Sequence, residues 1–238
     1  MTRDPVTPDP IRARRFSKAL RAWFKHHGRA LPWRDTRDPY RILVSELMLQ
    51  QTQVSRVVQF YERFLERFPD MYALAAARPR MVREAWEGLG YYARARNLHS
   101  LARTVTRERN TGTLPAEPNE LLELPGVGPY TAHAVATFAY ERRSAPVDTN
   151  VARVVARAFA PHLKLKRARD LTKLRELAHA ILPRTGKAAW VHNQGLMELG
   201  ALVCTARVAR CNDCPVRSAC LTGHGSRVKG HGRQMRLP

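Results

Sequence analysis

Two acidic residues of this chain stand where a carboxyl group could exchange a proton with a substrate. The first, Glu46, lies between the apolar runs 42–44 and 47–49. Because burying an ionised carboxylate is costly, Glu46 lies either on the solvent face of a helix or in a pocket with a purpose. In a pocket, desolvation would raise the pKa of Glu46 and favour the protonated acid near neutral pH.

The second acid follows a glycine-rich turn. The stretch 124–132 reads Leu-Pro-Gly-Val-Gly-Pro-Tyr-Thr-Ala, which predicts a helix, a tight turn and a second helix from near Pro129. Outward N–H groups at a helix N-terminus form a site for a phosphate. Asp148 could act on a nucleic acid held there, although a plain interhelical turn with a surface acid is the alternative. We expect left-handed glycines in the turn and DNA contacts at Gly126, Val127, Gly128 and Thr131.

All four cysteines lie near the C-terminus with the spacing C-x6-C-x2-C-x5-C. Disulfides are disfavoured in an intracellular protein, whereas a compact set of four thiolates can hold a metal ion or an iron–sulfur cluster. General spacing rules leave zinc open. Arginines occupy the gaps, so the segment predicts a basic loop that faces DNA. The predicted metal ligands are Cys204, Cys211, Cys214 and Cys220.

The composition favours a polyanionic partner. The chain has 238 residues with 41 Lys+Arg against 20 Asp+Glu, a formal net charge of +21, and phosphate contacts dominate non-specific nucleic-acid affinity. An arginine-rich composition can also follow from a GC-rich genome. No apolar run approaches the roughly 20 residues that span a membrane, and residues 1–10 do not resemble a signal peptide. We expect a cytoplasmic, nucleoid-associated protein.

The elements that must position these residues are predicted to be helices. Apolar side chains recur at helical spacing, and no segment shows convincing strand alternation. Within 40–66 the polar run 50–53 predicts a junction between two helices. The other predicted helices lie near 11–27, 72–77, 79–87, 92–109, 117–123, 130–140, 149–159, 168–182 and 190–203. We expect disorder in 1–10 and in the basic tail 222–238.

Several motifs together resemble one family. They are Ser-Glu-Leu-Met-Leu-Gln-Gln-Thr-Gln-Val at 45–54, Gly-Leu-Gly-Tyr-Tyr-Ala-Arg-Ala-Arg-Asn-Leu-His at 88–99, Leu-Pro-Trp-Arg at 31–34 and Met-Glu-Leu-Gly-Ala at 197–201. With the hairpin and the cysteine spacing, they resemble the MutY-type adenine DNA glycosylases of the helix-hairpin-helix (endonuclease III) superfamily. The resemblance covers about residues 16–221.

The resemblance implies an all-α fold of two lobes. The terminal lobe combines 11–38 with 146–221 and includes the loop 204–220, on which the resemblance places a 4Fe-4S cluster. The central lobe is 39–145, with the hairpin at about 121–132. Double-stranded DNA with a mismatched or damaged pair lies across the groove between the lobes, and one nucleotide is flipped out, because a stacked base is not accessible to a pocket.

The resemblance also implies a role for each candidate site residue. Glu46 matches the general acid that protonates the adenine, and Asp148 the acid that stabilises the oxocarbenium-like sugar. Asn150 supports this acid and its water network. The base pocket comprises Arg34, Leu49 and Tyr130. Gln51 and Tyr91 enter the duplex near the opposite base as a wedge, and Thr52 also contacts DNA.

The resemblance bears on the reaction type as well. At the position of Tyr130 the bifunctional branch of the superfamily has a lysine that forms a Schiff base, which a phenol cannot form. We therefore expect a monofunctional glycosylase with at most weak strand cleavage. We expect it to act as a monomer; other repair factors as partners are possible but unknown.

Two departures from the family pattern leave alternatives open. The chain ends soon after Cys220, so we expect the C-terminal domain that helps many adenine glycosylases recognise 8-oxoguanine to be absent. Thr149 stands where many adenine glycosylases have glycine. A residue other than glycine at this position is also seen in thymine glycosylases that act on T·G mismatches. A thymine or uracil glycosylase acting on T·G or U·G pairs is therefore the alternative. A DNA-binding iron–sulfur protein without catalysis is a remote third interpretation.

Overall fold

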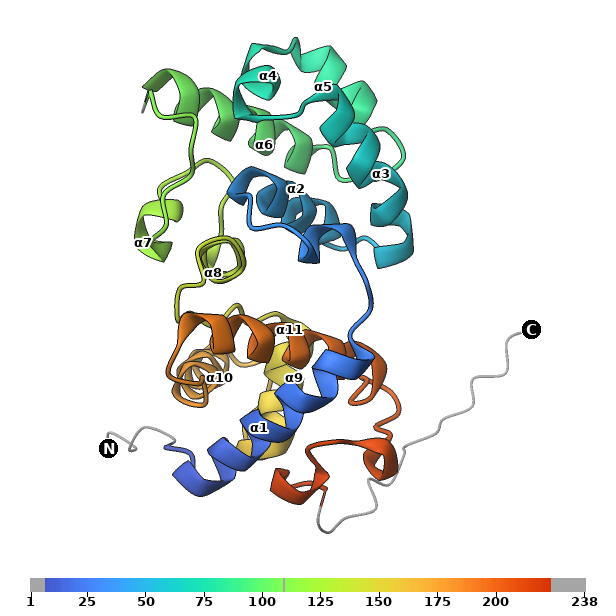
Figure 1. Cartoon of the computed structure of the whole chain (residues 1–238), viewed down its shortest axis with the longest axis vertical. Helices are drawn as coiled ribbons and strands as arrows, with labels where there is room; N and C mark the ends of the chain where they lie inside the picture. The colour runs from blue at the N-terminus through green and yellow to red at the C-terminus, as the bar shows by residue number, and fades with distance from the viewer. Residues whose placement is uncertain (1–6, 109, 224–238) are drawn as a thin grey trace, which may run out of the picture. The chain divides into compact units, whose positions relative to one another are not determined.

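The structure is a computed structural model that describes residues 7–108 and 110–223. These residues form helices joined by loops, with no strand among them beyond an isolated bridge between Cys204 and Ala209 (Figure 1). The predicted all-α fold is confirmed. The segments predicted to be disordered, 1–10 and 222–238, lie largely outside the described residues. Within the described ranges, no helix is both long and apolar enough to cross a membrane.

The predicted helices are present, with ends that differ by a few residues. The polar run 50–53 separates two helices as predicted. Sequence analysis did not predict the short 3-10 helices η1 (Pro32–Arg34), η3 (Cys211–Asp213) and η4 (Arg217–Ala219) or the π-helical turn η2 (Thr104–Glu108). The helices are α1 (Pro10–His27), α2 (Pro39–Leu49), α3 (Val54–Arg67), α4 (Met71–Ala76), α5 (Pro79–Ala85), α6 (Ala93–Arg103), α7 (Pro118–Leu121), α8 (Pro129–Phe138), α9 (Thr149–Phe159), α10 (Ala168–Ala180) and α11 (Gly186–Leu202).

Helix starts follow the local sequence. Proline stands in the first turn of α1, α2, α5, α7 and α8, where its missing N–H would be unpaired in any case. An aspartate side chain accepts a backbone N–H at the start of four helices and so caps the unsatisfied donors. The capping residues are Asp9, Asp38, Asp70 and Asp148.

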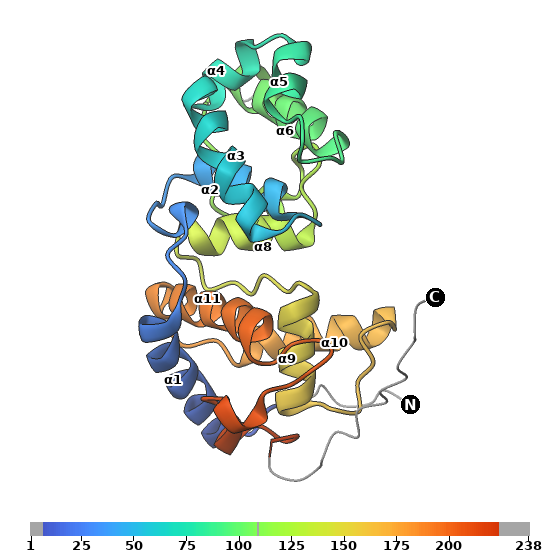
Figure 2. The same cartoon turned by 90° about the vertical axis from the view of Figure 1, so that its right-hand side faces the viewer.

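The chain folds into two compact units. The described part of unit 1 comprises 7–28, 147–183 and 191–223, and unit 2 comprises 29–146 and 184–190. In unit 2, α2 contacts α3, α6 and α8 (Figure 2). Residues 42–48 of α2 are buried. In unit 1, the Phe16 ring of α1 packs 5.0 Å from that of Phe159 at the end of α9.

Unit 2 contains two segments that the sequence-based lobe limits assign to the terminal lobe, 29–38 and 184–190. Side-chain contacts hold both of them in unit 2. The Trp33 ring packs edge-on to Tyr61, with centroids 5.4 Å apart. The Arg37 guanidinium lies 4.2 Å from the Trp190 ring centroid and pairs with Glu141 at 3.3 Å. These contacts join segments that are distant in the chain, so local patterns do not show them.

A buried histidine links two helices of unit 1. His192 of α11 is fully buried, and its Nδ1 lies 2.9 Å from the hydroxyl of Ser17 on α1. Burial, with a smaller effect of Arg21, lowers the pKa of His192 to about 3. His192 is therefore neutral near pH 7.

Candidate active site and cysteine loop

Glu46 lies inside unit 2. Only 5% of its surface is exposed, because it sits in the middle of α2, whose residues 42–48 are all buried. The sequence left open whether Glu46 is exposed on a helix or buried, and in the structure it is buried. The start of α2 is fixed by Asp38, whose carboxylate accepts the N–H of Tyr40 at 2.8 Å and of Arg41 at 3.2 Å.

Three residues predicted for a base pocket belong to the same unit as Glu46. Leu49 is the last residue of α2 and is half-buried. Arg34 ends η1, is half-buried, and donates a hydrogen bond from Nη1 to the carbonyl of Arg29 at 2.8 Å. Tyr130 stands in the first turn of α8 and is half-buried. All three side chains are thus partly accessible to a ligand.

The hairpin turn differs at one glycine from the expectation. Gly126 has φ +75°, and a Cβ there would lie 2.4 Å from the Cβ of Asn97, so both backbone and space require glycine. Gly128 has φ −92° and ψ 174° and precedes α8 as its N-cap. A left-handed Gly128 is therefore wrong, because the chain enters α8 through an extended residue that any amino acid can adopt.

The hairpin side chains are less exposed than its glycines. Val127 and Thr131 are 7% and 1% exposed, and the Thr131 hydroxyl lies 3.4 Å from Nε2 of Gln50. A DNA contact at these two residues would therefore use the backbone. Gly126 and Gly128 are exposed, and nothing lies within 4 Å of a Cβ built on Gly128.

The predicted wedge residues line one cavity. Gln51 and Tyr91 are both exposed and border a cavity of about 380 Å³ that is also lined by Gln50, Tyr92 and Arg96. Thr52 is half-buried. Gln51 and Thr52 also border a second cavity, of about 640 Å³. An aromatic ring and an amide are thus presented together on the surface of unit 2.

Asp148 lies in unit 1 at the N-terminus of α9. Its Oδ1 accepts the N–H of Val151 at 2.7 Å, and its Oδ2 accepts the side-chain amide of Asn150 at 3.2 Å. The structure therefore brings Asn150 to Asp148, as the predicted supporting role requires. The carboxylate is half-buried, and a helix N-terminus favours negative charge.

Sequence analysis missed Arg153, which joins this acid to the cysteine segment. Arg153 is 7% exposed and donates from Nη2 to Oδ1 of Asn150 and to the carbonyl of Gly200, each at 2.8 Å. Its Nε donates to the carbonyl of Cys204 at 3.0 Å. Burial lowers the pKa of Arg153. An arginine on a helix of a basic chain looks like a solvent-exposed charge, so the sequence carries no signal for this contact.

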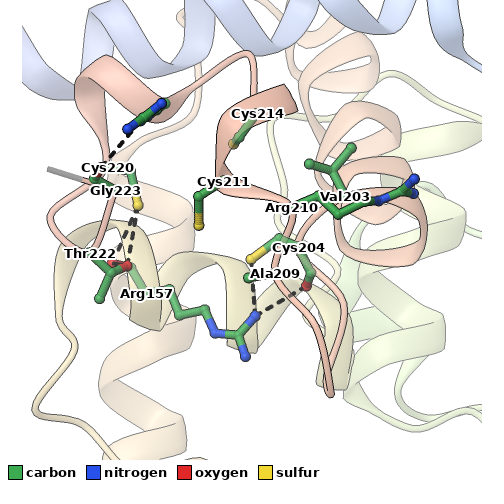
Figure 3. Close-up of a pocket in the computed structure, with 11 residues that line it drawn as sticks. Arg157, Val203, Cys204, Ala209, Arg210, Cys211, Cys214, Cys220, Thr222 and Gly223 are labelled. Carbon is green, nitrogen blue, oxygen red and sulfur yellow. Dashed lines mark hydrogen bonds between the residues drawn. The ribbon is translucent and has the colours of Figure 1, made fainter. Parts of the chain in front are cut away.

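The four cysteines surround one small cavity of about 50 Å³ (Figure 3). None of them forms a disulfide, and burial raises the pKa of the Cys214 thiol to about 11. Arg157 of α9 donates from Nη1 to Sγ of Cys204 at 3.3 Å and to the carbonyl of Thr205 at 2.8 Å. The chain after the last cysteine returns to α9, where the amide of Leu221 donates to the carbonyl of Ala158 at 3.0 Å.

This donor set fits an iron–sulfur cluster. Four thiols face one space, and cluster irons are held by cysteine thiolates. Arg157 places a positive charge 3.3 Å from the Cys204 sulfur. Among the described residues, no group of three or more His, Cys, Asp or Glu side chains is placed to hold a metal ion.

Comparisons with known proteins identify the family of this chain. Residues 44–183 match the model of the family described as "HhH-GPD superfamily base excision DNA repair protein". The adenine DNA glycosylase of Mycolicibacterium smegmatis is 45% identical over 199 residues, covering 83% of this chain and 66% of that protein. That of Buchnera aphidicola is 36% identical over 208 residues, covering 86% and 57%. The chain thus spans about three fifths of the length of these curated relatives.

Another relative matches along almost its whole length. The thymine-DNA glycosylase of Aeropyrum pernix is 35% identical over 215 residues, covering 90% of this chain and 96% of that protein. Among solved structures, a thermostable thymine-DNA glycosylase superimposes with a TM-score of 0.81 at 29% identity, covering 90% of this chain and 97% of the other.

Proposed function

Because this chain belongs to the HhH-GPD superfamily of base excision DNA repair proteins, we propose that it is a DNA glycosylase that releases adenine mispaired with 8-oxoguanine or guanine. The observation that carries the choice of adenine is the identity of 45% to an adenine DNA glycosylase, against 35% to a thymine-DNA glycosylase. The partner is double-stranded DNA, in keeping with the net charge of +21.

Glu46 is the general acid of the proposed reaction. Burial disfavours the charged form of a carboxyl group, and Glu46 is enclosed in α2 with 5% of its surface exposed. A protonated Glu46 donates its proton to a ring nitrogen of the flipped adenine. The C1′–N9 bond then breaks with its electron pair on the base, because a protonated purine is a better leaving group.

Asp148 stabilises the sugar cation left by this step. Its carboxylate is oriented by Val151 and Asn150 at 2.7 Å and 3.2 Å, and an oxocarbenium-like transition state is served by such an anion. Water then adds to C1′ and loses a proton, which leaves an abasic site. Asn150 acts as a positioning residue for Asp148.

Arg34, Leu49 and Tyr130 bind the base in this proposal. All three are half-buried in unit 2, so each combines a fixed position with an accessible surface. Tyr130 has no amine with which to form an imine with the opened sugar. The product is therefore an abasic site in an intact strand.

Cys204, Cys211, Cys214 and Cys220 hold a 4Fe-4S cluster in this proposal. A cluster with four thiolate ligands supplies a covalent cross-link rather than a reactive group. Arg157 binds the first cysteine segment to α9 through the Cys204 sulfur and the Thr205 carbonyl. Purified protein should contain iron and absorb broadly near 400 nm; protein without iron would contradict the assignment.

The test is single-turnover base release on end-labelled duplexes with A·8-oxoG, A·G, T·G and U·G pairs, each followed by alkali. We expect cleavage of the adenine strand in the first two. Cleavage of the thymine or uracil strand, with adenine untouched, would establish the second candidate, which the 96% coverage of the Aeropyrum pernix enzyme and the TM-score of 0.81 favour.

The variant Glu46→Gln tests whether there is catalysis at all. It keeps the shape of the side chain but cannot donate the proton, so base release should fall by about 10²–10⁴-fold while DNA affinity stays. Glu66→Gln is the matched control, because Glu66 is exposed on α3. A non-catalytic DNA-binding protein would release no base in either form.

A further inference from the structure

Arg94, the second residue of α6, is a buried cation surrounded by oxygen atoms. It is 7% exposed, and its guanidinium lies 5.6 Å from the Trp86 ring centroid and 5.5 Å from that of Tyr91. Neither the sequence motifs nor the proposed reaction gives Arg94 a role. A buried charge is costly unless its hydrogen bonds are made, so its partners indicate what it does.

One arm of Arg94 binds the end of α2. Nη1 lies 2.9 Å from the carbonyl of Leu47 and 2.8 Å from that of Met48. These carbonyls belong to the last turn of α2, which lacks partners within the helix and attracts a cation. Nη1 also lies 2.6 Å from the Gln50 carbonyl and 3.2 Å from the Thr52 hydroxyl. This nitrogen therefore contacts both the residue before Gln51 and the residue after it.

The other arm binds the turn before α6. Nη2 donates to the carbonyl of Leu89 at 3.1 Å and to that of Gly90 at 3.0 Å. Tyr91 follows directly. One planar group therefore fixes the residues on both sides of Gln51 and the two residues before Tyr91.

Gln51 and Tyr91 share an unfavourable backbone conformation. Their φ angles are +57° and +48°, a region that L-residues rarely adopt and that persists where the surroundings enforce it. Gln51 is exposed, Tyr91 is 62% exposed, and both border one cavity. Backbone strain without burial of the side chain indicates that the surface, rather than the core, requires this conformation.

We propose that Arg94 is a positioning residue that holds Gln51 and Tyr91 as one rigid pair, which enters the base stack of duplex DNA as a unit. The inference rests on the proposed function for its partner, duplex DNA with an extruded nucleotide. Two side chains ordered in advance lose less freedom on binding than two independent loops. Lysine cannot replace Arg94, because a single ammonium lacks the planar fork that reaches both loops.

The test compares Arg94→Lys with the wild type on a duplex that carries 2-aminopurine beside an A·8-oxoG pair. Fluorescence of 2-aminopurine rises when its stacking is broken, independently of base release. We expect Arg94→Lys to retain affinity for an undamaged duplex and to show a fluorescence rise and base release slower by about tenfold to a hundredfold. Arg103→Lys, at the exposed end of α6, should match the wild type.

A double-mutant cycle separates this role from a general weakening of unit 2. If Arg94 acts through the pair, Arg94→Lys should have little further effect on the fluorescence rise in a Tyr91→Ala protein. A full additional loss in that background would overturn the inference, as would an unchanged rise in the single variant. A rise that depends on Arg94 without release of any base would refute the glycosylase and leave the inference standing.

Hydrogen exchange of the wild-type protein provides a test that needs no variant to fold. The amides of 50–53 and 88–92 should exchange slowly and together with those of α2, since one guanidinium joins all three segments. Exchange of either loop at the rate of an unstructured peptide would show that Arg94 does not hold it.

Discussion

The two carboxyl groups proposed for catalysis are held in opposite ways. Glu46 lies in the middle of a helix, in a stretch whose residues are all buried. Asp148 lies at the start of a helix, and both of its oxygens accept hydrogen bonds. Burial disfavours the charged form of a carboxyl group, whereas the N-terminal end of a helix attracts negative charge. In the proposed reaction, the position on a helix therefore suits the same functional group to two different tasks.

The supporting arginines extend this contrast. Arg94 in unit 2 and Arg153 in unit 1 are each 7% exposed and bind main-chain carbonyls. Arg94 joins two surface loops beside the helix of Glu46, whereas Arg153 joins Asn150, and through it Asp148, to the segment that starts at Cys204. Arg94 thus orders part of the surface of unit 2, whereas Arg153 orders the surroundings of Asp148 in unit 1.

Neutralising the anion should have a large effect. Asp148→Asn retains an acceptor for the Val151 amide but removes the negative charge, so base release should fall by about 10²–10³-fold. Asp70→Asn is the matched control, because Asp70 caps α4 in the same way, accepting the Ala73 amide at 2.8 Å. The measurement is the single-turnover rate of base release by both variants. If Asp148→Asn is as fast as the control, Asp148 acts only as a helix cap.

Removal of the Arg153 guanidinium should weaken unit 1. Arg153→Met removes the donor to the Gly200 carbonyl and to the Asn150 side chain, and each buried unsatisfied group costs about 1–3 kcal/mol. The Cys204 carbonyl keeps a hydrogen bond from Arg157 at 3.4 Å. We expect urea unfolding to show a loss of about 2–5 kcal/mol, with reduced iron content. Arg169→Met, exposed on α10, should change neither. An unaltered unfolding midpoint for Arg153→Met would contradict the contrast between the units.

Two glycines should respond differently to alanine. A Cβ on Gly186 would lie 1.6 Å from the Glu141 carbonyl oxygen, in unit 2, whereas a Cβ on Gly200 would lie 2.9 Å from the Cβ of Asn150, in unit 1. Gly186→Ala should cost about 1–3 kcal/mol of stability. Gly200→Ala should cost less but slow base release, because it displaces Asn150. Thermal unfolding and the rate of base release should be measured for both variants. Equal effects of the two variants on both quantities would contradict this prediction.

The smallest expected effect is a dependence of stability on pH. The pKa of His192 is about 3 in the folded protein, below its unfolded value of about 6.5, so the unfolded chain binds the proton first. The neutral, buried His192 therefore contributes fully to the free energy of unfolding above pH 6.5. This free energy falls by about 1 kcal/mol between pH 6.5 and 5.5. His192→Asn should flatten the profile measured by urea unfolding, and exposed His162→Asn should not. Equal profiles for the two variants would exclude His192.

The helices could be predicted because their signals are local. Apolar side chains at helical spacing and prolines at helix starts define α1, α2 and α9 from a few adjacent residues. The burial of Glu46 could not be decided in this way, since it depends on the helices that pack around α2. The unit to which residues 29–38 belong could not be predicted for the same reason, because this segment joins unit 2 through the ring contacts of Trp33 and Arg37.

Contacts within one motif could be predicted from the sequence, whereas contacts between distant segments could not. Asp148 and Asn150 are two residues apart, and the structure joins them. Arg94 and Arg153 bind carbonyls that converge only after folding, so nothing near them in the sequence distinguishes them from surface arginines. The extended backbone of Gly128 could not be predicted, because a glycine permits a left-handed conformation without requiring it.

The position of α1 in the chain has a consequence for synthesis on the ribosome. Phe16 and Leu20 have no exposed surface in the folded protein, yet Phe159 and His192, against which this helix packs, emerge long afterwards. At ribosomal rates this interval is on the order of ten seconds. The nascent α1 must stay in solution with its apolar side uncovered while unit 2 is made. Arginines of α1, such as Arg12, Arg14 and Arg15, keep this nascent segment charged and hinder its association with other chains before its partners are made.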